Sequence, residues 1–74
     1  MQDLGSSLRD RRKQLGLTQL EAAELADVSV RFVHDIENGK RTAQLDRVQA
    51  LANALGLTLE LRLRKTIEQS VGDN

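Results

Sequence analysis

The sequence predicts an all-α domain built around a helix-turn-helix, and three observations support this prediction. Residues 17–41, LTQLEAAELADVSVRFVHDIENGKR, have the form of two short helices joined by a tight turn. Apolar residues recur at helical spacing on either side of this stretch. The 74-residue chain also has no proline and a single aromatic residue, which suits helices packed around an aliphatic core.

The first predicted helix covers residues 4–15. Asp3 can cap its start, and Gly16 can end it. Its apolar side is made of three leucines, Leu4, Leu8 and Leu15.

Thr18 begins the second predicted helix, and Glu21 three residues later completes a capping box. Its interior, residues 20–26, is rich in alanine, leucine and glutamate, which are strong helix formers. The turn that follows places Asp27 where a helix-turn-helix often has a left-handed glycine, a conformation that aspartate tolerates better than most residues.

Ser29 caps the third predicted helix, residues 30–38, which buries Val33 and Ile36 and ends at Gly39. A polar link, residues 40–44, leads to a fourth helix at 45–55, which Gly56 closes. The apolar stripe of this fourth helix has helical spacing and consists of Leu45, Val48, Leu51, Ala52 and Leu55.

The hydrophobic period changes to two after the fourth helix, which predicts a half-buried strand at 57–64. A helix here would spread its leucines around the circumference and bury no coherent face. Because no other segment resembles a strand, we expect this one to pair with its counterpart in a second copy across a two-fold axis. The leucines expected in this dimer contact are Leu57, Leu59, Leu61 and Leu63. Residues 65–74 show no periodicity and are expected to form a flexible tail.

Composition restricts the function classes. There are no cysteines and no nucleophile–base constellation, metal cluster or phosphate-cradling glycine loop, so we expect neither an enzyme nor a cofactor. No apolar run is long enough to cross a bilayer and no signal-peptide pattern opens the chain, which predicts a cytoplasmic protein. With 11 basic and 11 acidic residues, the net charge is zero, which predicts weak binding to DNA of arbitrary sequence.

Four sequence runs resemble the Cro/C1-type (XRE) helix-turn-helix family: GLTQ at 16–19, VS at 28–29, IENGKR at 36–41 and ALGLTLEL at 54–61. The resemblance covers about residues 4–56, and the added strand, which extends it to about 64, resembles the HipB-type or Y4mF-type antitoxin branch. The family implies a lambda-repressor-like bundle of four to five helices, with residues 29–38 as recognition helix. It also implies a homodimer on a DNA operator with two-fold symmetry.

The branch implies the antitoxin of a type II toxin–antitoxin module, which represses its own operon and restrains a HipA-like serine/threonine kinase. Two alternatives stay open: a stand-alone phage-type or housekeeping repressor, and a protein-only adaptor that has lost DNA binding. This chain departs from the family at Asp27, where glycine is usual, and at Ala22, where leucine is usual and where Leu25 could fill the space.

The residues expected to contact DNA lie at the start of the second helix, along the third helix and just after it: Gln19, Ser29, Val30, Arg31, His34, Asp35, Asn38, Lys40 and Arg41. Arg31 is the best base reader, because its planar fork matches guanine O6 and N7. Val30 could meet a thymine methyl group. Asp35 could accept from cytosine N4, or it could be an intramolecular partner of Arg31.

Gln19 lies at a helix N-terminus, where phosphate is attracted, and the resemblance implies that it also supports the recognition helix. The residues around the ends of the third helix, Ser29, Asn38, Lys40 and Arg41, are expected to bind phosphates without reading sequence. For His34 a DNA contact and a plain surface position stay open. Phe32 is a weak candidate, because packing at the edge of the core explains it equally well.

The resemblance pairs Arg12 with Glu37, which gives a structural ion pair between the first and third helices. Two readings stay open: a partly buried pair that locks the helices together, and a loose surface pair.

Overall fold

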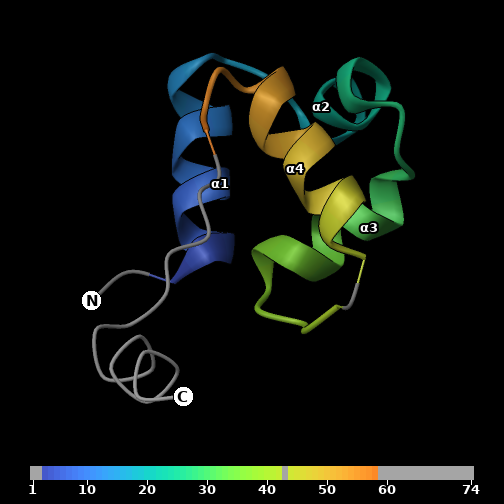
Figure 1. The fold of residues 1–74 in the computed structure, drawn as a ribbon. Helices are drawn as coiled ribbons and strands as arrows, with labels where there is room; N and C mark the ends of the chain where they lie inside the picture. The colour runs from blue at the N-terminus through green and yellow to red at the C-terminus, as the bar shows by residue number, and fades with distance from the viewer. Residues whose placement is uncertain (1–2, 43, 59–74) are drawn as a thin grey trace, which may run out of the picture.

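The structure, a computed structural model, describes residues 3–42 and 44–58, and these form four helices (Figure 1). They are α1 (Leu4–Gln14), α2 (Gln19–Ala26), α3 (Val30–Glu37) and α4 (Leu45–Ala54). Helix α2 packs against both α3 and α4, and α1 packs against α3. The four predicted helices are therefore confirmed, with ends that agree to within about one residue.

Three of the helices begin where the sequence supplies a capping side chain. The Asp3 carboxylate accepts from the backbone N–H of Ser6 at 2.8 Å, and the Ser29 hydroxyl accepts from that of Phe32 at 3.0 Å. Thr18 and Glu21 form the predicted capping box, with reciprocal bonds of 3.0 and 2.8 Å. These caps satisfy orphan N–H groups and fix where α1, α2 and α3 start.

The turn between α2 and α3 depends on a left-handed residue, as predicted. Asp27 has φ 57° and ψ 45° and is the only non-glycine residue with positive φ among those that the structure describes. Gly39, with φ 85°, follows the last residues of α3 and ends the helix. Both positions set the angles at which α3 meets its neighbours.

The core is aliphatic, and its largest fully buried side chains are Leu8, Val33, Val48, Leu51 and Leu55. Alanines line the inner side of α2: Ala22, Ala23 and Ala26. Because these side chains are small, α3 and α4 can approach α2 closely.

The apolar stripes were predicted too broadly. Leu4, Leu15 and Leu45 are exposed, because each lies at or next to a helix end that the other three described helices leave uncovered. Leu25 is 62% exposed, so it does not fill the space beside Ala22. Ala22 is nevertheless fully buried, because the neighbouring helices pack closely enough around it that no larger side chain is needed to fill the space.

Gly5 is a structural residue that the sequence analysis missed. It is buried in α1, and a Cβ atom at this position would overlap the carbonyl oxygen of Ile36 and lie 3.2 Å from its carbonyl carbon. Helix α1 therefore approaches the end of α3 along a backbone surface that only glycine permits.

Most of the predicted strand and its dimer contact, residues 59–64, lies outside the described residues, as does the predicted tail at 65–74. Leu57 is partly buried against the core, and residues 57–58 carry no strand. None of the helices in the described part of the chain is long and apolar enough to cross a membrane.

Candidate nucleic-acid interface

The first turn of α2 and the outer side of α3 together line a shallow hollow of about 410 Å³. Its lining consists of Gln19, Val30, Arg31, His34 and Asp35. All five were singled out from the sequence as DNA-contact candidates, and the fold brings them together from two helices. An exposed helix with such a face has the size and form that enters the major groove of B-DNA.

A buried network holds this face in place from behind. The Arg12 guanidinium donates to both carboxylate oxygens of Glu37, at 2.7 and 3.0 Å, and to the backbone carbonyl of Leu17 at 2.8 Å. Gln19 Nε2 also donates to Glu37, at 3.1 Å. The side chains of Arg12 and Glu37 are only 10% and 2% exposed, so the structure shows the buried form of the predicted pair. The network connects α1, α2 and α3.

The ionisation of this pair follows from its contacts. Burial alone raises the pKa of Glu37, but hydrogen bonds from Arg12 and Gln19, together with the charges of Arg12 and Arg9, outweigh it and leave the pKa below its ordinary range. The hydrogen bond to Glu37 raises the pKa of Arg12 further above its already high value. Both groups therefore stay charged.

The Gln19 side chain is bonded to α3 rather than projecting freely. Its amide bonds Glu37 at the end of α3, while its backbone is at the first turn of α2, where N–H groups attract phosphate. A single residue thus connects the N-terminal end of α2 to the end of α3.

Asp35 forms a cluster of charges on the outer side of α3. Its carboxylate lies 3.9 Å from Arg31 Nε, 3.6 Å from Lys40 Nζ and 3.6 Å from His34 Nδ1. The Asp35 side chain is 29% exposed, whereas its three partners are mostly exposed. The intramolecular pairing with Arg31 that the sequence left open is present, and Lys40 joins it.

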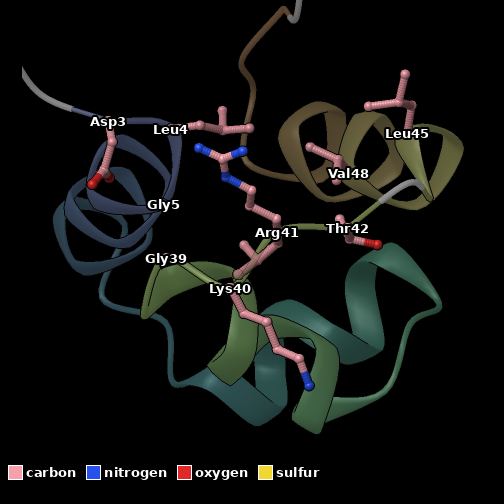
Figure 2. Close-up of a pocket in the computed structure, with 10 residues that line it drawn as sticks. Asp3, Leu4, Gly5, Gly39, Lys40, Arg41, Thr42, Leu45 and Val48 are labelled. Atoms are coloured by element: carbon pink, nitrogen blue, oxygen red, sulfur yellow. The ribbon is translucent and has the colours of Figure 1, made fainter.

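The basic pair after α3 divides between two directions. Figure 2 shows Lys40 pointing along α3, whereas the guanidinium of Arg41 reaches toward Leu4 at the start of α1. Lys40 and Arg41 also line a second hollow of about 400 Å³, with Phe32 and Thr42. The two cations therefore border one hollow, but their side chains extend from it in different directions.

Ser29 and Asn38 serve the two ends of α3. Ser29 caps its start, and Asn38 Nδ2 donates to the carbonyl of His34 at 2.7 Å. Both side chains are exposed, so these structural roles leave their remaining polar atoms accessible. Phe32 is half-buried against the core, and it also lines the second hollow.

Thr42 and Gln44, which line the second hollow, were not among the predicted contacts. The sequence feature that could have identified them is the polar link, residues 40–44, in which they follow the basic pair. Thr42 Oγ1 accepts from the backbone N–H of Gln44 at 3.0 Å, which orders the link.

Comparison with known proteins places this arrangement in a family. The helix-turn-helix family HTH_3 matches residues 8–61. The chain is 39% identical over 59 residues to the uncharacterized HTH-type transcriptional regulator y4mF of Sinorhizobium fredii, covering 80% of this chain and 78% of that protein. It is 35% identical over 52 residues to the HTH-type transcriptional regulator DdrOP3 of Deinococcus deserti, covering 70% of this chain but 40% of that longer protein. The chain therefore belongs to the HTH_3 helix-turn-helix family, of the XRE type.

Proposed function

We propose that this chain is a sequence-specific DNA-binding transcriptional repressor. The observation that carries the proposal is the hollow formed by Gln19, Val30, Arg31, His34 and Asp35 on one exposed face of α2 and α3. Membership of a family whose relatives here are named as transcriptional regulators supports it. The α3 helix enters the major groove, and the start of α2 meets the flanking phosphates.

The proposal divides the predicted contacts into base readers and phosphate contacts. Arg31, whose side chain is 84% exposed, reads guanine, and Val30 contacts a thymine methyl group. The residues at the ends of α3 fix its position through phosphates: Ser29, Asn38, Lys40 and Arg41. With four to five such contacts in each half-site, a dimer makes about eight to ten, and the log–log slope of affinity against salt is about −7 to −9.

The test is a binding titration with the DNA directly upstream of the reading frame, against a scrambled duplex of the same length. Retention of the upstream duplex at moderate salt, with release at high salt, supports the proposal. Failure to bind either duplex at low salt would overturn it and leave the protein-only adaptor, which the zero net charge favours.

The Arg31→Ala variant sharpens this test. It should lose the preference for the upstream duplex while still binding scrambled DNA at low salt. An equal loss on both duplexes would place Arg31 among the phosphate contacts instead.

We further propose that the repressor is a homodimer joined through the leucines of residues 57–64. The alternation of leucine with polar residues supports this proposal. The Leu61→Lys variant should show half the wild-type mass by light scattering and weaker operator binding. A Leu61→Lys protein that stays a tight dimer would overturn the proposed pairing of residues 57–64 across the dimer.

An antitoxin role is the finer proposal, and it is supported by the sequence resemblance to HipB-type proteins. In this role the dimer represses its own operon and binds a HipA-like kinase. Coexpression with the product of the adjacent reading frame tests it: a stable complex that suppresses kinase activity supports the role. A neighbouring product that neither binds nor has kinase activity favours the stand-alone repressor.

A further inference from the structure

Asp35 occupies the ridge between the two hollows beside the recognition helix, because it lines both of them. The other charged residues that line these hollows are the cations Arg31, Lys40 and Arg41, together with His34. Asp35 is therefore the one carboxylate among the described residues that line this surface. Any DNA that meets α3 must place either a base edge or a phosphate close to it.

Two of the three permanent cations lie within ion-pair distance of this carboxylate. Arg31 Nε and Lys40 Nζ lie 3.9 and 3.6 Å from it, and the backbone N–H of Lys40 donates to the Asp35 carbonyl at 2.9 Å. The backbone hydrogen bond fixes the main chain of Lys40 at the end of α3. The lysine side chain therefore begins close to Asp35. Phosphates must compete with Asp35 for both cations.

We propose that Asp35 determines specificity by holding Arg31 and Lys40 in the free protein and releasing them only where a cytosine faces its carboxylate. This inference rests on the proposed function, and it names the feature that an operator half-site must contain. On random DNA no base donor replaces the two cations at the carboxylate, so Arg31 and Lys40 stay partly occupied by Asp35, and the carboxylate also repels the nearby phosphates. Binding there is weak.

Cytosine is the base that satisfies a carboxylate best in the major groove. An ionised carboxylate only accepts hydrogen bonds. Cytosine presents the N4 amino donor, whereas adenine presents its N6 donor beside the N7 acceptor, which repels a carboxylate, and guanine presents acceptors at N7 and O6. When cytosine N4 binds Asp35, Arg31 is freed for a neighbouring guanine, and Lys40 is freed for a phosphate.

The test compares wild type with Asp35→Asn, Asp35→Glu and Glu24→Gln. Asp35→Asn removes the charge with little change in shape, and Asp35→Glu keeps the charge. Glu24→Gln removes one exposed carboxylate from α2, away from both hollows. Binding is measured by fluorescence anisotropy over a range of salt, with duplexes selected by the wild type from a random pool and with a scrambled duplex.

Asp35→Asn should bind the scrambled duplex about tenfold more tightly at low salt, with a salt slope steeper by about one per protomer. The ratio of selected to scrambled affinity should fall at least about tenfold. Asp35→Glu should retain most of that ratio, and Glu24→Gln should leave it unchanged. Thermal melting of Asp35→Asn should match the wild type, because the Asp35 pairs are loose and the partner side chains are mostly exposed.

Selection from the random pool gives an independent readout that a merely structural role would not change. Wild type should select cytosine at one position of each half-site, and Asp35→Asn should change that position to adenine, since an amide pairs with adenine N6 and N7. An unchanged ratio and unchanged selected sequences for Asp35→Asn would overturn the inference while leaving the repressor proposal intact. A wild type that selects no sequence at all would overturn both.

Discussion

Helix α3 carries two carboxylates two residues apart, and they illustrate two different uses of the same chemical group. Glu37 faces inward, is 2% exposed and accepts from Arg12 at 2.7 Å. Asp35 faces outward, is 29% exposed and has its cations at 3.6 to 3.9 Å. The inner pair has full hydrogen-bond geometry, whereas the outer pairs are loose.

The difference shows how a small helix separates stability from recognition. The inner carboxylate is committed to Arg12 and Gln19, so it cannot exchange partners without loss of structure. The outer carboxylate holds its partners weakly, so DNA can replace them at little cost to the fold. The inner side of α3 therefore determines where the helix sits, and the outer side determines what it binds.

The largest expected effect comes from removing the inner cation. Arg12→Ala should lower the free energy of unfolding by about 3–5 kcal/mol, because Glu37 is left buried and unpaired. The matched outer variant, Arg31→Ala, should change it by less than about 1 kcal/mol. Urea denaturation measures both, and similar losses in the two variants would remove the distinction between the two sides of α3.

Gly5→Ala disrupts the packing of α1 against α3 through a steric clash, without changing any charge. The added methyl overlaps the carbonyl of Ile36, so α1 must move away from α3 at a cost of about 1–3 kcal/mol. Ser7→Ala, in the same helix, is the control and should be neutral or slightly stabilising, since alanine is the better helix former. A Gly5→Ala protein as stable as Ser7→Ala would contradict the close approach of α1 to α3.

The pH dependence of stability sharpens the comparison. Because the pKa of folded Glu37 is below its ordinary range, its contribution is complete at neutral pH and is lost as the pH falls through that lowered pKa. Glu37→Gln should therefore be less stable than wild type at pH 7 and should lose less stability on acidification. Parallel stability curves for wild type and Glu37→Gln between neutral and acidic pH would contradict the assigned ion pair.

The smallest predicted effect is at the turn that joins α2 to α3. Asp27→Gly relieves the strain of the left-handed conformation, which stabilises the folded state. Because glycine also gives the unfolded chain more conformational freedom, the net rise in the free energy of unfolding should be less than about 1 kcal/mol. Asp27→Ala should lower the free energy of unfolding, since alanine tolerates the left-handed conformation less well than aspartate. Thermal melting of the two variants distinguishes these outcomes by the sign of the change.

The fold could be predicted largely because its boundaries are local chemistry. Aspartate, threonine and serine cap a helix when they directly precede a helical pattern, as Asp3, Thr18 and Ser29 do here. Asp27 and Gly39 mark the ends of α2 and α3. Such signals need no knowledge of neighbours in space.

The parts of the fold that could not be predicted depend on which residues, distant in the sequence, become neighbours in space. The role of Gly5 depends on the backbone of Ile36, which is distant in sequence, and helical spacing alone does not show that Leu4, Leu15 and Leu45 lack a covering neighbour.

The candidate site was predictable in its membership but not in its internal contacts. The outer side of α3 follows from helical spacing, which identified Val30, Arg31, His34 and Asp35. The capture of Lys40 by Asp35 depends on how the chain turns after Gly39, because that turn brings the lysine back along the helix. Spacing alone cannot show this.

The most direct test of this account is an NMR titration of the wild-type chain with its upstream duplex, following backbone amide shifts. The account predicts that the largest changes occur at Gln19 and at residues 30–35, with smaller changes at Lys40. Changes centred on the exposed side of α2 at Leu20 and Leu25, or no changes at low salt, would contradict the claim that the outer side of α3 binds DNA.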